Sequence, residues 1–582
     1  MIRRIFGCVR EFKGITVLTV ILMVLESAIE TTIPFITASL VNKLTEGAEL
    51  KDILWTGAIL VVLAMLSLAS GGLAGITSAK ASAGFARNLR GDIFNKIQTY
   101  SFENIDKFSS TSLVTRLTTD VMHAQMSFMM IIRTAIRSPL MLIFAVIMAS
   151  FMGGAMAATF VVIIPVLAGG LLLIARIAMP TFRRIFKKYD KLNESVEENV
   201  RAARVVKGFS REEYEKEKFT RASETIRDDF TKAERIVALN TPLMQICLYF
   251  NMVFVLFLGT SIAVKTVGQT INVGHISAMI TYGTQVLMSL MMLSMIYVMI
   301  TMSTESFKRI YEVLSEEPAM DNNEQSELEV ADGSIDFEGV SFKYSKDAEK
   351  YTLSDVDLHI PSGATVGVIG GTGSSKSTLV NLIPRLYDAT VGTVKVGGRD
   401  VRDYSISTLR GAVSMVLQKN LLFAGTIKDN LRWGNENATD EEVIEACKLA
   451  QAHDFVSSFP DGYDTHIEQG GTNVSGGQKQ RLCIARALLK KPKILILDDS
   501  TSAVDTKTDH LIRLGFAKYM PDTTKIIIAQ RISSVMDADM IIVMDGGRVV
   551  ASGNHSQLLE SSHIYREVYV QQTEGKGDSD DE

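Results

Sequence analysis

Hydrophobic residues gather in the first half of the chain, in runs longer than the core of a soluble domain requires. A helix needs about 20 mostly apolar residues to cross the hydrocarbon of a bilayer. Six runs reach that length, at 15–40, 53–78, 129–150, 155–179, 238–265 and 272–303. The pattern predicts six membrane-spanning helices, after which the chain returns to the side on which it began.

Basic residues are shared unequally between the two sides of these runs. They crowd the N-terminus and the stretches 80–137 and 176–236. The loops on the other side carry only Lys43, Lys51 and Lys265. Because Lys and Arg accumulate on the cytoplasmic side of membrane proteins, both termini are expected in the cytoplasm. The two long internal connections have helical periodicity and mixed charge. Solvated charged helix faces would explain this pattern, and so would long helices that extend from the membrane to a cytosolic domain.

Two carboxylates interrupt the first apolar run. Glu26 and Glu30 lie one helical turn apart, and an ionised carboxylate in hydrocarbon is costly. They either contact a cationic substrate from a protein-lined cavity, or lie near the outer interface and hydrogen-bond a neighbouring helix.

The sixth run carries a stripe of methionines at helical spacing. They are Met288, Met291, Met292, Met295 and Met299. Such a stripe either lines an adaptable apolar pocket or packs against another helix. Glu26, Glu30, Met288, Met292, Met295 and Met299 are therefore the candidate substrate contacts.

The hydrophobic pattern changes after Leu314, and three boundaries follow from it. Residues 1–314 form the predicted membrane domain, and the polar, acidic stretch 315–333 is the expected linker. Residues 334–573 contain short alternating and β-branched runs, which are typical of a soluble domain with strands. Residues 574–582 form an acidic tail that we expect to be disordered.

A glycine-rich turn between a β-branched run and an apolar helix is the most specific feature of the second half. The turn is Gly370-Gly371-Thr372-Gly373-Ser374-Ser375, and Lys376-Ser377-Thr378 open the helix. Small residues let backbone N–H groups close on a phosphate at a helix N-terminus. In such loops the lysine reaches the β- and γ-phosphates and the following hydroxyl binds Mg²⁺, so we expect ATP and Mg²⁺ here. Ser375 replaces the second Gly of the usual pattern and places a Cβ beside the phosphates.

Further polar and aromatic residues stand where a nucleotide site needs them. Tyr344 follows a predicted strand and is placed to stack on a base, and Gln418 ends another strand. Asp498 ends the buried run Ile494–Leu497. A carboxylate that coordinates Mg²⁺ beside a phosphate loop is presented in the same way, at the end of a buried strand. The motif Ser475-Gly476-Gly477-Gln478 lies between the phosphate loop and this strand.

Together these motifs resemble a half-transporter of the ATP-binding cassette (ABC) exporter family over essentially the whole chain. The resemblance implies an α-helical six-span transmembrane domain followed by an α/β P-loop nucleotide-binding domain with a helical subdomain. It implies that Tyr344 stacks on adenine, that Gln418 senses Mg²⁺ and contacts the membrane half, and that Asp498 is the Walker B carboxylate. By the same likeness Ser475–Gln478 is the signature, Ser502–Asp505 is the D-loop, and the segments 102–108 and 205–212 are coupling helices.

Two catalytic positions depart from the pattern of that family. A Glu normally follows the Walker B residue and activates water, but this chain has Asp499. A carboxylate withdrawn by about 1.5 Å can reduce the rate on the order of 10²-fold. Gln530 stands where a switch histidine is usual, and an amide cannot become cationic against developing negative charge.

These departures turn into a prediction about partners, because cassettes of this family dimerise head to tail. The chain's own ATP site is expected to be impaired in hydrolysis, while its intact signature serves a competent site on a second, different half-transporter. A homodimeric exporter or lipid flippase with slow ATPase activity is the first alternative. A membrane protein that ATP regulates and that does not pump is the second.

Composition agrees with a membrane protein and leaves the cargo open. The 582 residues are 47% hydrophobic, with a net charge of −5 and a mean hydropathy of +0.18. Cys8, Cys247, Cys447 and Cys483 show no metal-site or disulfide spacing. The expected location is a bacterial cytoplasmic membrane, with membrane lipids as partners and no nucleic acid. The expected cargo is a small amphipathic molecule, drug, lipid or peptide.

Overall fold

The computed structural model describes residues 1–45, 47–266, 270–322, 326, 328–345, 348–499 and 504–574. Two compact units make up the chain. The first comprises Met1–Thr99 and Phe108–Glu316, and the second comprises Tyr100–Lys107 and Glu317–Glu582. The short segment Tyr100–Lys107 therefore groups with residues more than 200 positions later in the sequence.

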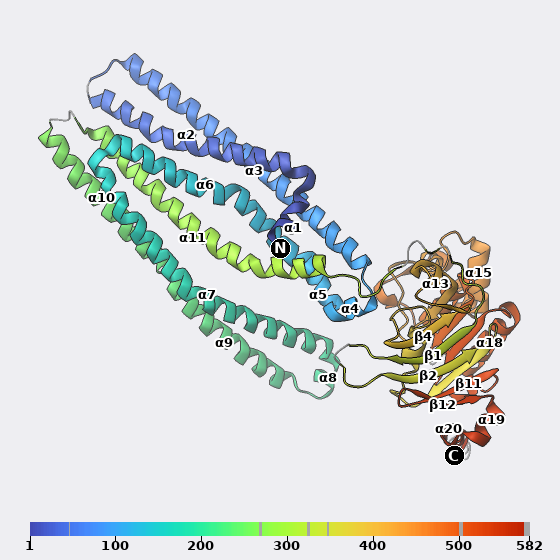
Figure 1. The fold of residues 1–582 in the computed structure, drawn as a ribbon. Coiled ribbons are helices and arrows are strands. Elements are labelled where there is room, and N and C mark those ends of the chain that lie inside the picture. Colours follow the sequence, from blue (N-terminus) through green and yellow to red (C-terminus); the bar gives the residue numbers. More distant parts are fainter. Residues whose placement is uncertain are drawn as a thin grey trace. The chain divides into compact units, whose positions relative to one another are not determined.

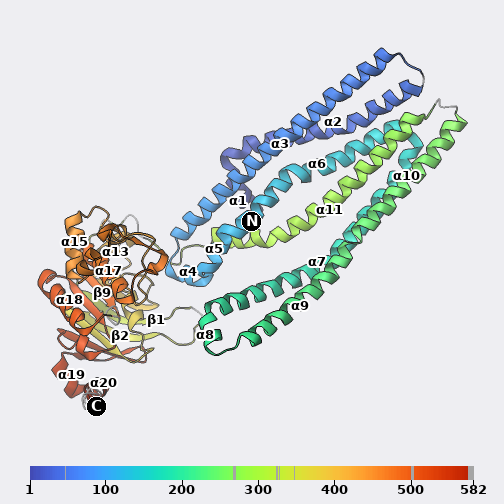
Figure 2. The same ribbon diagram turned by 180° about the vertical axis from the view of Figure 1, so that it is seen from behind.

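The first unit consists of helices. They are α1 Ile2–Phe6, η1 Gly7–Phe12, α2 Lys13–Thr45, α3 Leu50–Gln98, α5 Ser110–Thr115, η2 Arg116–Asp120, α6 Val121–Gly153, η3 Gly154–Ala157, α7 Ala158–Arg201, α8 Ala203–Gly208, α9 Glu212–Val237, α10 Asn240–Lys265 and α11 Val273–Ser315. In Figures 1 and 2, α2 runs beside α3, α6 beside α11, and α7 beside α9. The six predicted runs fall largely in α2, α3, α6, α7, α10 and α11. Helices α2, α3 and α6 extend past their runs at both ends, whereas the runs 155–179, 238–265 and 272–303 begin one to three residues before α7, α10 and α11.

Among the described residues, five helical stretches are long and apolar enough to cross a membrane. They are Arg3–Thr45, Leu50–Gln98, Ser110–Arg201, Glu212–Lys265 and Val273–Ser315. The stretch Ser110–Arg201 holds both α6 and α7, which are separated by a turn at Gly154, where φ is +48°. Helix α3 has 49 residues, which at 1.5 Å per residue is about 74 Å and more than twice the thickness of bilayer hydrocarbon.

The surface of the first unit carries large apolar side chains where its spans run. Phe257 of α10, for example, is 78% exposed, and Val161 of α7 is 76% exposed. A soluble protein rarely exposes such side chains in continuous faces. These faces are suited to contact with lipid.

The described residues of the second unit form three sheets. One has the order β2-β1-β4-β5, with strands Leu353–Ile360, Ile335–Phe342, Val391–Val396 and Arg399–Asp400. The main sheet has the order β12-β11-β3-β10-β9-β6, with strands Arg548–Gly553, Met540–Asp545, Thr365–Gly370, Thr524–Ile528, Ile494–Asp498 and Val413–Val416. The pair β7 Gly425–Thr426 and β8 His466–Ile467 is the third.

The remaining elements of the second unit are helices, most of them labelled in Figures 1 and 2. They are α4 Phe102–Phe108, α12 Lys376–Asn381, α13 Ile406–Ala412, α14 Ile427–Arg432, α15 Asp440–Leu449, α16 His453–Ser457, η4 Gly462–Asp464, η5 Gln469–Gly471, α17 Gly476–Leu489, α18 Thr506–Tyr519, η6 Ile532–Ser534, α19 His555–Ser561 and α20 His563–Glu574.

The centre of the main sheet positions the functional residues. Strands β9 and β10 bury every residue, as expected for parallel strands that are covered on both faces. Strands β3, β6, β9, β10 and β11 are parallel, so their carboxyl ends meet at one edge. Ligands of open α/β sheets bind at this edge, and here the phosphate loop follows β3 and Asp498 ends β9.

Candidate functional site

The phosphate loop joins β3 to α12 and holds its lysine folded over the turn. Lys376 Nζ donates to the carbonyl oxygens of Gly370 and Gly371, each at 2.9 Å, and lies 3.3 Å from Ser374 Oγ. Burial lowers the pKa of Lys376, although the nearby carboxylates of Asp498 and Asp499 raise it. A partly desolvated ammonium group held by neutral carbonyls is suited to receive a phosphate.

Backbone geometry explains which positions of the loop require glycine. A Cβ at Gly370 would lie 2.2 Å from the carbonyl oxygen of Met544, whereas a Cβ at Gly371 or Gly373 would meet nothing within 4 Å. Gly373 has a φ of +83°. Ser375 adopts the left-handed conformation, with φ +71° and ψ +25°. The residue that departs from the sequence pattern therefore occupies a conformation that favours glycine.

Replacing Ser375 with Gly is expected to stabilise the protein by about 1 kcal/mol, because glycine removes the strain of a left-handed residue. The unfolding midpoint of the purified protein would rise by about 1–2 °C. Ser374→Gly is the matched control. Its φ is not positive, so glycine there should lower the midpoint through backbone entropy. A midpoint that falls in both variants would contradict this account of Ser375.

Two oxygen ligands stand side by side at the mouth of the loop. Ser377 Oγ donates to Asp498 Oδ1 at 3.1 Å. Burial raises the pKa of Asp498, as does the neighbouring Asp499, while Ser377 and Lys376 act in the opposite direction. Among the described residues no group of three or more His, Cys, Asp or Glu side chains could hold a metal. Mg²⁺ needs no such group, because it binds through one or two protein oxygens, water and substrate phosphates, and this pair fits that role.

Two of the predicted catalytic residues, Gln418 and Gln530, face the carboxylate of the third, Asp499. Asp499 follows β9 with a φ of +47°, and its Oδ2 accepts from Gln530 Nε2 at 2.8 Å. Gln418, which follows β6, lies with its Nε2 at 3.4 Å from the same oxygen. Because β6, β9 and β10 are neighbouring parallel strands, residues that follow their ends meet at the same edge of the sheet. Two neutral amides therefore face Asp499.

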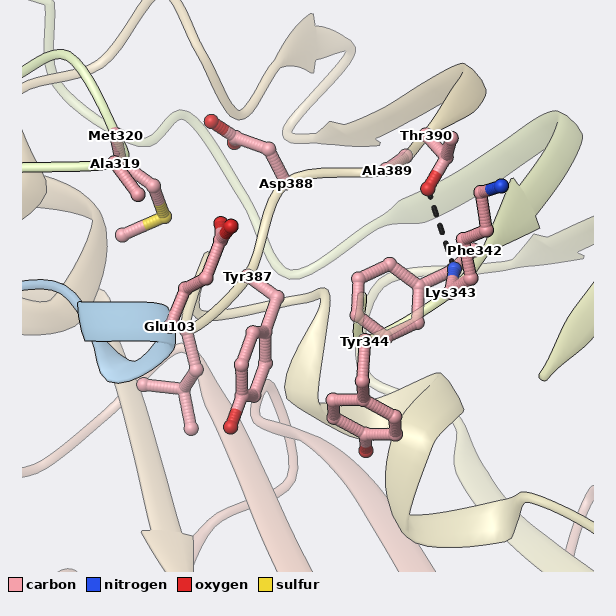
Figure 3. Close-up of a pocket in the computed structure, with 11 residues that line it drawn as sticks. Glu103, Ala319, Met320, Phe342, Lys343, Tyr344, Tyr387, Asp388, Ala389 and Thr390 are labelled. Carbon is pink, nitrogen blue, oxygen red and sulfur yellow. Dashed lines mark hydrogen bonds between the residues drawn. The ribbon is translucent and has the colours of Figure 1, made fainter. Parts of the chain in front are cut away.

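Tyr344 lines a cavity of about 280 Å³ next to the phosphate-loop helix (Figure 3). Its hydroxyl lies 3.0 Å from Thr378 Oγ1, and the residue is 43% exposed. Edges of Phe342 and Tyr387 contact the ring, with centroids at 4.9 and 5.1 Å. Tyr387 carries no sequence motif that would have revealed it, and sequence reasoning missed it.

The motif Ser475–Gln478 forms the exposed N-terminus of α17. Ser475 Oγ accepts from the backbone N–H of Gln478 at 3.3 Å, and Gln478 Oε1 accepts from that of Ser475 at 2.9 Å. This reciprocal capping leaves Gly476 and Gly477 in the first turn of the helix. Within the described residues, these four make no hydrogen bond to residues 370–378 of the same chain.

Part of the predicted D-loop can also be placed. Asp505 caps α18, and its carboxylate accepts from the backbone N–H of Thr508 at 2.9 Å. Its hydrogen bonds with Thr508 lower the pKa of Asp505. Ser502 and Ala503, like the predicted tail beyond Glu574, lie outside the described residues.

The two intramembrane glutamates are paired with an arginine. Arg137 Nη2 contacts both carboxylate oxygens of Glu30, at 2.8 and 2.7 Å, and Glu26 Oε1 at 3.4 Å. Glu26 is only 8% exposed, and a Cβ at Gly71 of α3 would lie 2.9 Å from its Oε1. Both glutamates therefore face protein. Sequence reasoning counted Arg137 with the cytoplasmic basic residues, although its place inside the run 129–150 could have identified it as their partner.

Removing this arginine should destabilise the membrane unit by about 1–2 kcal/mol, because it leaves two carboxylates without their cation. Thermal unfolding of Arg137→Ala in lipid would measure the loss. Arg90→Ala is the control, since Arg90 of α3 is exposed and should change stability by less than about 0.5 kcal/mol. When Glu26→Gln and Glu30→Gln are both present, Arg137→Ala should cause a smaller loss of stability. An undiminished effect would show that the ion pairs are not its cause.

The methionine stripe lies on the surface of the chain. Met288, Met292 and Met295 are exposed, and Met299 is half-buried. The stripe therefore does not form the core of this unit. It remains accessible to lipid, to a second subunit or to a ligand.

Comparison with known proteins identifies relatives of the whole chain. Residues 16–290 match the family described as ABC transporter transmembrane region, and residues 353–502 match the family described as ABC transporter. The uncharacterized ABC transporter ATP-binding protein YfiB of Bacillus subtilis (strain 168) is 35% identical over 558 residues, covering 95% of this chain and 96% of its own. The mitochondrial potassium channel ATP-binding subunit of Rattus norvegicus is 32% identical over 490 residues, covering 84% and 68%. A bacterial Atm1-family ABC exporter solved with ATP bound has 25% identity and a TM-score of 0.82, with 96% of this chain and 98% of that chain covered.

Proposed function

The chain belongs to the ABC transporter family, and on this premise we propose that it is one half of a heterodimeric exporter. It is an ABC exporter with a helical transmembrane domain followed by an ATPase domain that couples ATP hydrolysis to transport. In our proposal six spans cross a bacterial cytoplasmic membrane, counting α6 and α7 separately, and both termini are cytoplasmic. The segments 102–108, which forms α4, and 205–212, which begins in α8 and ends where α9 starts, act as coupling helices.

The observation that carries the heterodimer is the contact between the two departing residues. Asp499 Oδ2 accepts from Gln530 at 2.8 Å and faces Gln418 at 3.4 Å. A carboxylate oxygen engaged by two amides has less capacity to accept a proton from attacking water. The aspartate is also shorter than the usual glutamate, so its carboxylate is withdrawn by about 1.5 Å.

In this proposal the chain's two motifs serve different ATP sites. Residues 370–378, which include Lys376, bind ATP and turn it over slowly. Ser377 and Asp498 would hold Mg²⁺, which would neutralise charge on the phosphates. The exposed signature, Ser475–Gln478, completes a competent site on the partner. Hydrolysis there drives alternating access, while the chain's own site keeps the cassettes together.

Charged and apolar side chains of the membrane domain bear on the cargo. Glu26 and Glu30 lie beside the guanidinium of Arg137, and Arg133 also interacts electrostatically with Glu26. The exposed methionines offer an adaptable apolar surface. We propose a small amphipathic molecule or drug as cargo, with lipids and peptides as alternatives.

The decisive experiment is steady-state ATPase activity of this chain alone in lipid, beside the chain co-expressed with a candidate partner. The heterodimer predicts little turnover alone and robust turnover in the pair. Robust turnover alone would support the homodimeric exporter or flippase instead.

A second candidate function rests on one relative. The rat protein is called a potassium channel ATP-binding subunit, which would fit a membrane protein that ATP regulates without pumping. Transport of a cargo against its gradient into inverted vesicles, dependent on ATP, would exclude this candidate.

A further inference from the structure

Tyr387 lies in a row of side chains that begins at the phosphate-loop helix and ends at α4. The Tyr344 hydroxyl lies 3.0 Å from Thr378 Oγ1, two residues after Lys376. The rings of Tyr344 and Tyr387 meet edge to face, with centroids 5.1 Å apart and planes at 89°. The Tyr387 hydroxyl donates to Asp106 Oδ2 of α4 at 2.8 Å. Figure 3 shows Tyr387 between Tyr344 and the helix that carries Glu103.

Helix α4 is in turn attached to the segment that follows α11. Asn104 is only 3% exposed, and its Nδ2 donates to the carbonyl oxygen of Glu317 at 3.0 Å. Its Oδ1 accepts from the backbone N–H of Ala319 at 2.9 Å. The ring of Phe102 packs 6.0 Å from that of Tyr387. These residues all belong to one compact unit, so α4 and residues 317–319 are expected to move together.

The hydroxyl of Tyr387 is suited to remain a hydrogen-bond donor. Burial is the largest cause that raises the pKa of Tyr387, and the hydrogen bond to Asp106 raises this pKa further. The side chain therefore stays protonated at neutral pH. Its ring and its hydroxyl face different neighbours, Tyr344 and Asp106, and can be altered separately.

We propose that Tyr387 is a positioning residue that transmits the seating of an adenine base on Tyr344 to α4 and to residues 317–319. The inference rests on the proposed function, in which this chain's own site binds ATP as a clamp. A purine that stacks on Tyr344 restricts its ring, and the edge contact passes that restriction to Tyr387 because packed side chains have few alternative arrangements. The hydrogen bond to Asp106 then orders α4.

Hydrogen exchange of the peptide 100–108 in the full-length protein in lipid tests this relay. Saturating ATP with Mg²⁺ should slow exchange of α4 by about fivefold or more. Inorganic triphosphate, which has phosphates and no base, should leave it unchanged. Tyr387→Phe keeps both ring contacts and removes the donor, so it should reduce the ATP effect to less than about twofold while ATP affinity stays within about twofold.

Asp106 provides the matched controls. Asp106→Asn retains an acceptor for the Tyr387 hydroxyl and should preserve the ATP effect, whereas Asp106→Leu should abolish it. Combined with Tyr387→Phe, Asp106→Leu should add no further loss. Equal protection by triphosphate, or an undiminished effect in Tyr387→Phe, would overturn the relay alone. Failure of ATP to bind this chain's own site would overturn the proposed clamp and the relay together.

Discussion

Replacing Gly477 with Asp is expected to lower the ATPase activity of the assembled exporter by about 10²- to 10³-fold. Gly477 lies in the first turn of α17, whose N-terminus is exposed. In the proposed heterodimer this helix end faces the γ-phosphate bound by the partner, and a carboxylate there would repel it. The chain itself should fold, since an acidic residue in the first turn stabilises a helix.

The informative quantity is the contrast with the chain's own catalytic carboxylate. Asp499→Asn should change the same activity by less than about twofold, because hydrolysis would occur at the other site. Gly477→Ala, which adds a methyl group without charge, should lose much less activity than Gly477→Asp. Equal losses in Gly477→Asp and Asp499→Asn would show that both sites hydrolyse ATP and would favour a homodimer.

Restoring the usual residues at the chain's own site should produce the second large effect. In the Gly477→Asp background, Asp499→Glu with Gln530→His is expected to raise residual ATPase activity on the order of 10²-fold. Glutamate moves the carboxylate outward by about 1.5 Å, and histidine supplies a donor that can become cationic. The same change removes the 2.8 Å contact between Asp499 and Gln530.

The Gly477→Asp background shows which ATP site produces the recovered ATPase activity. Gly477→Asp silences the site that uses this chain's signature, so any recovered turnover comes from the site of Lys376. Asp499→Asn with Gln530→His is the control, because it supplies the histidine without a base and should stay inactive. No gain in the Glu and His variant would mean that Asp499 and Gln530 do not limit hydrolysis there.

Several features of this protein follow from local sequence alone. The six apolar runs lie in the long helices of the first unit, because the length of a membrane span is set by the bilayer and is readable without a partner. The phosphate loop can also be predicted from local sequence. Its strand, turn and helix are consecutive, and its chemistry uses backbone N–H groups and residues within a few positions of one another. Asp498 was predicted for the same reason, as the end of a buried strand.

Other features needed the tertiary structure, since they join residues that are distant in sequence. Arg137 and Glu30 are 107 positions apart, and Tyr387 and Asp106 are 281 apart. Sequence reasoning named Asp499, Gln418 and Gln530 separately, but only the strand order places both glutamines beside the carboxylate of Asp499. The sequence thus determined which elements form and which chemistry each carries, through spacing and local backbone preference. The packing of helices and the order of strands decided which side chains meet, because no local pattern encodes contacts between distant segments.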